Sequence, residues 1–142
     1  MTKILAIALL VGAGYAATPD TNPVGPDKVV YHLNSGLEQA ADGLRNIRNH
    51  LEVNPKAHIV VVAHARGVDY LMKGAKDKNG NPFQVAVEQL QNEGVQFDVC
   101  EITLRNRQLK RDQFIPDVVF VPSGVAEITR LQAREHYAYL RP

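Results

Sequence analysis

The sequence lacks the features that mark several common classes of protein. It has a single cysteine in 142 residues, which excludes a framework of internal disulfides. Sixteen basic and fifteen acidic residues leave a formal charge of +1, so we expect no nucleic acid or anionic membrane surface as a partner. No long run of like charges, internal repeat or low-complexity tract is present. The composition, 45% hydrophobic and 22% charged, is that of one globular domain with a real core.

Long apolar runs are also lacking, apart from one at the amino end. Ile4 to Val11 is unbroken, but it is too short to span a bilayer, which takes about 20 residues. Lys3 precedes the run, and small residues follow at Gly14 and Ala16. This pattern predicts a signal peptide over residues 1–17, cleaved after Ala16 or Ala17, and a periplasmic or secreted protein. The alternative is an amino-terminal strand or helix that stays in the fold.

The proline-rich residues 18–27 then predict a linker, and a single domain is expected over residues 28–142. Within it, short apolar runs alternate with helix-like stripes. The run Ile59 to Ala63 is wholly apolar, as expected of a central strand. Strands are predicted near 29–33, 58–64, 95–99, 118–121 and 137–140, with helices near 37–51, 83–90 and 125–132. This alternation predicts an α/β fold whose parallel sheet is covered on both faces.

Two segments have a weaker pattern. Val68 to Met72 is predicted to form a short helix. Glu101 to Phe114 is predicted to be an irregular or partly helical connection, basic on its outer side.

Chemistry-bearing residues follow the predicted strands. The carboxyl ends of parallel strands meet at one edge of a sheet, where ligands bind in α/β proteins. We therefore expect one group of side chains there, formed by Cys100 with His32, Asn34, Ser35, His64, Arg66, Gly67, Ser123 and Gly124. Cationic groups and helix N-termini nearby would lower the pKa of a thiol, so Cys100 is the candidate nucleophile and the others are candidates for stabilising its thiolate or binding substrate.

Each of these residues also has a purely structural interpretation. Cys100 could be a buried small hydrophobe, which is the usual fate of a free cysteine. His32 and His64 could lie behind the site without taking part. Ser123 and Gly124 form an ordinary helix start, and Tyr139 could serve in edge-strand packing or in a subunit interface.

Several stretches resemble the DsrE/DsrF-like (YchN-like) family. They are 29–35, 60–67, the run Phe97-Asp98-Val99-Cys100-Glu101-Ile102-Thr103-Leu104, the run from Val121 to Ile128, and the ending from Tyr137 to Pro142. The resemblance implies a three-layer α/β/α sandwich with a five-stranded parallel sheet, often assembled as a trimer or hexamer. It also implies sulfur-relay chemistry, with a persulfide carried on the cysteine at the position of Cys100.

Three functions follow as hypotheses. The first is a periplasmic sulfur carrier or sulfurtransferase-like protein, which holds sulfane sulfur on Cys100 between donor and acceptor proteins and needs no cofactor. The second is a metal-binding module in which His32, His64 and Cys100 hold copper or zinc. The third is a non-catalytic assembly subunit that docks a partner through its oligomer or its basic segment 105–111.

Overall fold

The computed structural model of the protein describes residues 25–142. The predicted signal peptide at 1–17 and most of the predicted linker at 18–27 lie outside the described residues. Within the described residues, no helix combines the length and the apolar character that a membrane crossing requires.

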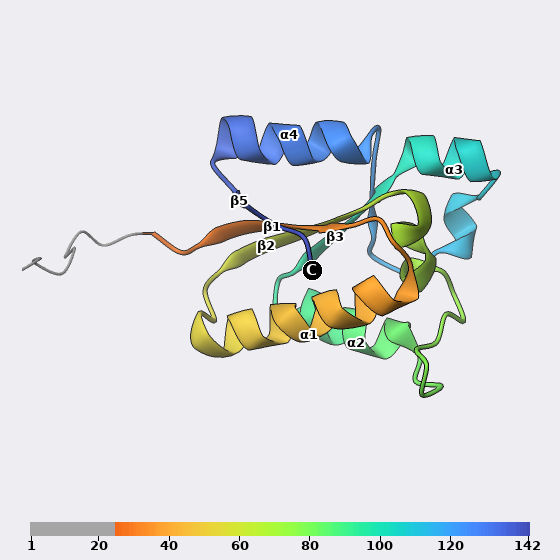
Figure 1. The fold of residues 1–142 in the computed structure, drawn as a ribbon, viewed down its shortest axis with the longest axis horizontal. Helices are drawn as coiled ribbons and strands as arrows, with labels where there is room; N and C mark the ends of the chain where they lie inside the picture. The colour runs from red at the N-terminus through yellow and green to blue at the C-terminus, as the bar shows by residue number, and fades with distance from the viewer. Residues whose placement is uncertain (1–24) are drawn as a thin grey trace, which may run out of the picture.

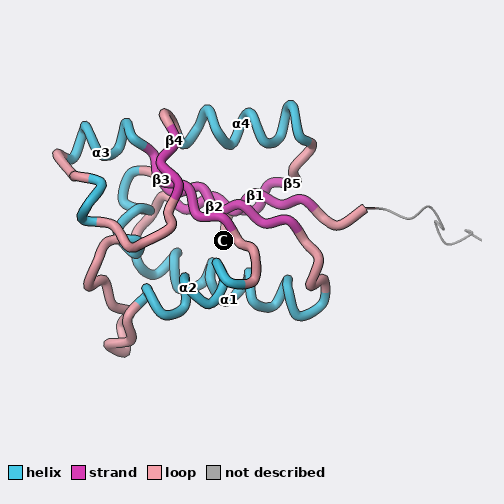
Figure 2. The backbone as a smooth tube through the Cα atoms, turned by 180° about the vertical axis from the view of Figure 1, so that it is seen from behind, coloured by secondary structure: helices cyan, strands magenta, loops and turns pink. Residues whose placement is uncertain are grey.

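The described chain is built on one five-stranded sheet in which every strand pairs in parallel. The strands are β1 (Lys28–Leu33), β2 (His58–Ala63), β3 (Gln96–Cys100), β4 (Val119–Val121) and β5 (Ala138–Leu140). Their order across the sheet is β4-β3-β2-β1-β5, so β2 is central, as its apolar sequence predicts. Figure 2 shows the strands stacked edge to edge between two layers of helix.

Helices cover both faces of the sheet (Figure 1). On one face lie α1 (Leu37–Val53) and α2 (Phe83–Asn92), and on the other lie α3 (Glu101–Arg107) and α4 (Gly124–Glu135). Two short 3-10 helices, η1 (Ala65–Leu71) and η2 (Arg111–Gln113), complete the connections. The predicted three-layer α/β/α sandwich with a five-stranded parallel sheet is confirmed.

The two faces of the sheet are unequally filled. A cluster of 22 buried apolar residues lies on the side of α1 and α2, and it takes the alternate side chains of β1, β2 and β3. The opposite cluster has only five, contributed by the intervening strand positions and by α4. Alternation along each strand divides the residues between the two clusters, since successive side chains point to opposite faces. The α4 face is therefore the thinner layer, with room for polar groups.

The segment after β2 differs from the sequence-based prediction. In place of a helix over Val68 to Met72, a 3-10 helix begins at Ala65, directly after the strand. Gly67 explains the early turn, because a Cβ atom there would lie 2.0 Å from the carbonyl oxygen of Leu33. Only a residue without a side chain allows this helix to pass so close to β1.

The connection predicted over Glu101 to Phe114 divides into two short helices. In it, α3 begins at the residue after Cys100 and ends at Arg107, and its C-cap Gln108 adopts a left-handed conformation (φ 54°). Few apolar residues mark this segment, and only Thr103 and Leu104 of α3 are buried. As a result Cys100 is both the last residue of β3 and the N-cap of α3.

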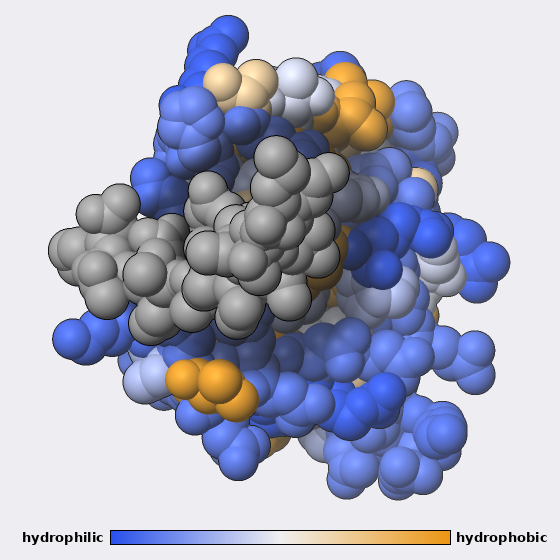
Figure 3. All heavy atoms as spheres, turned by 60° about the vertical axis from the view of Figure 1, so that its left-hand side comes forward, coloured by the Kyte–Doolittle hydropathy of each residue, from blue (hydrophilic) through white to orange (hydrophobic). Residues whose placement is uncertain are grey.

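The surface carries scattered apolar side chains. Figure 3 shows a mostly hydrophilic face on which hydrophobic residues form small, separate patches. Near the carboxyl ends of the strands the exposed apolar residues are Ile102 and Val125, and on the β5 edge they are Tyr139 and Leu140.

Candidate functional site

A pocket opens where β2 and β3 end and α4 begins. Its volume is about 390 Å³. It is lined by residues of the β2–η1 turn, of the β3–α3 junction and of the start of α4, which are His64, Ala65, Arg66, Cys100, Ile102, Thr103, Asn106, Arg107, Ser123 and Val125. Of the residues predicted at the strand ends, His64, Arg66, Cys100 and Ser123 lie together around this pocket.

Cys100 is 5% exposed, and four hydrogen-bond donor groups lie beside its sulfur. The donors are the backbone N–H groups of Ile102, Thr103 and Gly124 and the hydroxyl of Thr103. Burial raises the pKa of the Cys100 thiol, but these donors favour the thiolate and together leave the pKa below its ordinary value. A cysteine buried only for packing would have a raised pKa, so this pocket favours a thiolate.

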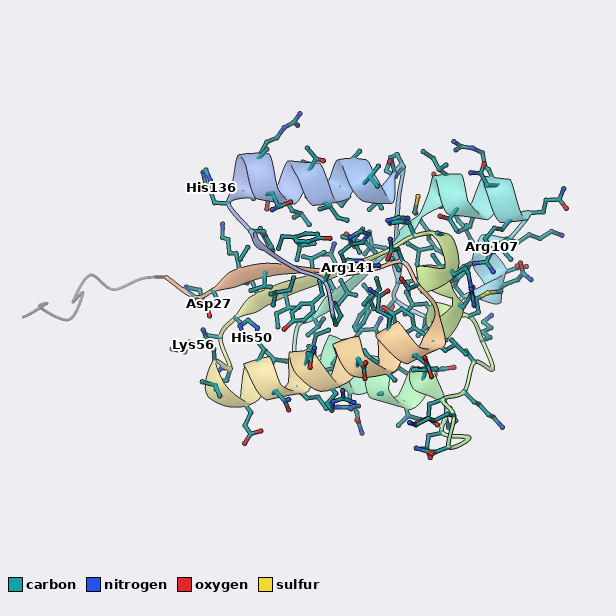
Figure 4. The ribbon with its side chains drawn as sticks, in the orientation of Figure 1. Asp27, His50, Lys56, Arg107, His136 and Arg141 are labelled. Carbon is teal, nitrogen blue, oxygen red and sulfur yellow. The ribbon has the colours of Figure 1, made fainter. Side chains whose placement is uncertain are left out.

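Thr103 connects the sulfur to the turn after β2. Its hydroxyl oxygen accepts a hydrogen bond from the backbone N–H of Ala65 at 2.8 Å, which leaves the hydroxyl hydrogen for Cys100. The Ala65 carbonyl in turn accepts from the Arg107 guanidinium at 2.9 Å, and Arg107 also pairs with Asp69 at 2.6 Å. Figure 4 shows Arg107 beside this turn.

These contacts hold Ala65 in a left-handed conformation, φ 50°. Such a backbone is unfavourable for a residue with a side chain and persists where its surroundings enforce it. The pocket wall is therefore fixed by α3 rather than by the turn itself.

Gly124 brings the first turn of α4 against the cysteine. A Cβ atom at this position would lie 3.1 Å from the Cβ of His64 and 3.3 Å from the Cβ of Cys100. Both contacts are tighter than ordinary packing, so a glycine lets the N–H of Gly124 approach the sulfur. Ser123 caps the same helix, and its hydroxyl accepts a hydrogen bond from the Ala126 N–H at 3.3 Å.

The two predicted histidines, His32 and His64, are hydrogen-bonded to each other. Nε2 of His32 and Nε2 of His64 lie 2.6 Å apart, and the rings stack with centroids 4.8 Å apart. Nδ1 of His32 is 2.6 Å from the hydroxyl of Tyr139. His64 lines the Cys100 pocket, whereas His32 lies behind it, between His64 and β5.

Asn34 and Ser35 lie away from the pocket. Both backbone N–H groups donate to the Gln39 side chain, and both side-chain oxygens accept from the Arg141 guanidinium. These residues fasten the carboxyl end of the chain to the start of α1. Gly67 also does not line the pocket. It is buried against Leu33, where it allows close packing.

Arg66 is exposed and lines the pocket. Within residues 25–142 it takes part in no ion pair, in contrast to Arg107. Its charge is therefore available to an anion held in the pocket.

No three side chains of the histidine, cysteine, aspartate or glutamate type come together as a metal centre anywhere in residues 25–142. The hypothesis of a copper or zinc centre made by His32, His64 and Cys100 therefore lacks the geometry it requires. The hydrogen bond between the two histidines also occupies the nitrogens that would face a shared ion.

The fold and the pocket together define a parallel α/β protein with a buried cysteine at the strand ends, where nearby hydrogen-bond donors lower the pKa of its thiol. Residues 28–142 match the model of the DsrE/DsrF-like family, and the chain belongs to that family.

The solved structures that are similar to it include the following two. One is a protein of unknown function, MTH1491 from Methanobacterium thermoautotrophicum, with 32% identity, a TM-score of 0.73, and coverage of 82% of this chain and 99% of that one. The other is the ychN protein of E. coli, with 18% identity, a TM-score of 0.68 and the same coverage, which shows the shared fold. No curated protein matches the chain.

Sequence reasoning missed several residues of the site. Thr103 and Tyr139 contact the predicted site residues Cys100 and His32, and Arg107 lines the pocket, but the sequence assigns none of the three to the site. The Cys-x-x-Thr-Leu element could have revealed Thr103, since a residue three positions into a helix faces back toward its N-cap. No local signal marks Arg107 or Tyr139, because their partners are distant in the sequence.

Proposed function

We propose that this protein is a sulfur carrier that holds sulfane sulfur as a persulfide on Cys100. The observation that carries the proposal is the set of four hydrogen-bond donors on one buried sulfur atom. Such donors stabilise an anion on sulfur, both in the free thiolate and in the thiolate that leaves when sulfur is handed on. Membership of the DsrE/DsrF-like family supports the same chemistry.

Loading needs a donor that carries a sulfane sulfur, such as a polysulfide or a protein persulfide. The Cys100 thiolate attacks the outer sulfur of the donor, a new S–S bond forms on Cys100, and the S–S bond of the donor breaks. The donor leaves as a thiolate, so no electrons are gained or lost overall. Arg66, which lines the pocket without an ion-pair partner in residues 25–142, would balance the charge of the bound anion.

The mostly apolar wall formed by Ile102, Val125 and Ala65 suits a neutral or singly charged sulfur species. We also propose, from the amino-terminal pattern alone, that the carrier acts outside the cytoplasm.

The test is the intact mass of the protein after incubation with polysulfide. Wild type should gain about 32 Da for each sulfur atom bound, and the gain should disappear on treatment with a reductant. Cys100→Ser is the matched control, because it keeps the side-chain volume and removes the thiol. A native protein that gains no mass and resists alkylation until denatured would contradict the proposal and favour the assembly subunit.

A further inference from the structure

The hydrogen-bonded row of Tyr139, His32 and His64 lies beside the Cys100 pocket and has no part in the loading step. Tyr139 lies on β5, His32 on the neighbouring β1, and His64 directly after the end of β2, and all three continue the strand positions that face α4. Both distances in the row are 2.6 Å. Each of these short contacts is a hydrogen bond, so one of its two atoms must donate a hydrogen and the other must accept it.

The row can carry its hydrogens in either of two directions. A neutral imidazole has one donor and one acceptor nitrogen, and a phenol can donate or accept. In one arrangement Tyr139 donates to His32, which donates to His64, and the free Nδ1 of His64 carries a hydrogen. In the other arrangement every bond is reversed, and Nδ1 of His64 is an acceptor.

The imidazoles must be neutral for this reversal, and their surroundings favour that state. Burial, then the neighbouring His64 and Arg141, lower the pKa of His32 to about 4. Burial also lowers the pKa of His64. Near neutral pH a positive charge does not accumulate on either ring, so a proton accepted at one end has to leave at the other.

The two ends of the row have the exposure that such a transfer requires. His64 lines the pocket that contains Cys100, and among residues 25–142 its Nδ1 has no hydrogen-bond partner. Tyr139 is 40% exposed on the last strand of the sheet. One end of the row therefore borders the pocket that also contains Cys100, and the other end reaches the surface.

We propose that Tyr139, His32 and His64 form a proton relay for the unloading of Cys100. This inference rests on the proposed sulfur-carrier function. An acceptor thiol entering the pocket gives its proton to Nδ1 of His64, the row reverses, and Tyr139 releases one proton at the surface. The acceptor thiolate then attacks the outer sulfur of the protonated persulfide, the bond between that sulfur and the Cys100 sulfur breaks, and Cys100 leaves as a thiolate. The products are the acceptor persulfide, the Cys100 thiolate and one proton.

The relay is needed only when the acceptor still has a proton to lose. Unloading is therefore measured with two acceptors at pH 7: an alkyl thiol, which is protonated, and an acidic aryl thiol, which is already ionised. The full chain is loaded with polysulfide, freed of excess reagent and mixed with each acceptor. Loss of the extra mass on Cys100 is followed with time.

Tyr139→Phe keeps the ring and removes the hydroxyl, and His32→Phe keeps a ring against His64 and removes both nitrogens. Each variant should slow unloading to the alkyl thiol by roughly a hundredfold, at the low end of what general acid–base catalysis contributes. Each should leave unloading to the aryl thiol and the alkylation rate of Cys100 unchanged. Tyr137→Phe is the matched control. Tyr137 directly precedes β5 and makes no hydrogen bond to His32, so this variant should behave as wild type.

Failure of the relay and failure of the carrier function are distinguishable. If Cys100 takes up no sulfur, the carrier function is wrong and the relay falls with it. If Cys100 loads but both variants unload to the alkyl thiol at the wild-type rate, the relay alone is overturned. Equal slowing with both acceptors would also overturn it, because that result reports a disturbed pocket rather than a lost proton path.

Discussion

At the scale of single residues, Thr103 is the side chain on which the reactivity of Cys100 depends most directly. Its hydroxyl is the one side-chain donor among the four on the sulfur. Thr103→Val should raise the pKa of Cys100, because it removes a hydrogen-bond donor that favours the thiolate. Alkylation by iodoacetamide should therefore slow at pH 7 and return to the wild-type rate at high pH.

Thr129→Val is the control for this experiment. The Thr129 hydroxyl donates to the carbonyl of Val125 on the exposed side of α4, away from the sulfur. A Thr103→Val protein that is folded and alkylates at the wild-type rate at pH 7 would show that the hydroxyl does not act on the thiolate.

Asp98 is a second residue whose surroundings make a prediction. It is fully buried on β3, and its Oδ2 has no hydrogen-bond partner within residues 25–142. Burial raises the pKa of this carboxyl to about 6, partly offset by the Gln96 amide. The folded state thus holds a proton that the unfolded state, with a pKa of about 3.9, has lost, so stability should fall as pH rises from about 4 to about 6.

The full loss amounts to roughly 3 kcal/mol in the free energy of unfolding. His32 opposes it: its lowered pKa makes stability rise over the pH range from about 4 to 6.5. Wild type should therefore show a shallow pH dependence, and Asp98→Asn should reveal a rising one in urea unfolding between pH 4 and 7. Identical slopes in the two proteins would mean that Asp98 does not titrate in this range.

At the scale of elements, the approach of α4 to the end of β3 completes the donor set. Gly124→Ala must push His64 and Cys100 apart by a few tenths of an ångström, given Cβ contacts of 3.1 and 3.3 Å. The protein should still fold, but the backbone N–H of residue 124 should be displaced from the Cys100 sulfur. Cys100 should then have a higher pKa and alkylate more slowly at pH 7.

Ser123→Ala separates this effect from general weakening of α4. It removes the helix cap, at a cost of about 1 kcal/mol, and leaves the amide of Gly124 in place. If Ser123→Ala slows alkylation as much as Gly124→Ala, the stability of the helix and not the position of the amide controls the thiol.

The elements themselves were largely predictable from the sequence, and the site only in part. An unbroken apolar run such as Ile59 to Ala63 indicates a strand whose two faces are both buried, and this pattern can be recognised from the local sequence alone. The helix α3 was harder, because Thr103 and Leu104 alone mark its buried side. The strand ends located Cys100 and His64, but the bonds from Thr103 to Ala65 and from Tyr139 to His32 join residues 38 and 107 positions apart. Such pairings depend on tertiary packing and leave no local pattern.

At the scale of the whole molecule, the β5 edge is the surface most in need of a partner. Leu140 is 44% exposed on a strand that pairs on one side only. An unpaired, apolar edge strand favours association. We expect a homo-oligomer, a trimer or hexamer before a dimer, in light scattering at micromolar concentration, and a purely monomeric protein would contradict this.

Export is a separate prediction for the whole chain, and it concerns residues outside the described part. The apolar run from Ile4 to Val11 and the small residues after it predict cleavage by a signal peptidase. Protein recovered from its native envelope should begin near Ala17 or Thr18 by amino-terminal sequencing. A native protein that begins at Met1 would favour a retained segment instead.

The unequal filling of the two faces has a consequence for how the sulfur is presented. Local opening costs least where the fewest apolar contacts hold an element, and α4 rests on a cluster of five residues against 22 on the opposite face. Gly124 sits in the first turn of α4, so any outward movement of that helix both uncovers the sulfur and withdraws one of its donors. Under the proposed function, a sulfur atom held on Cys100 would be sheltered while α4 is packed on the sheet and exposed to an acceptor when α4 moves outward.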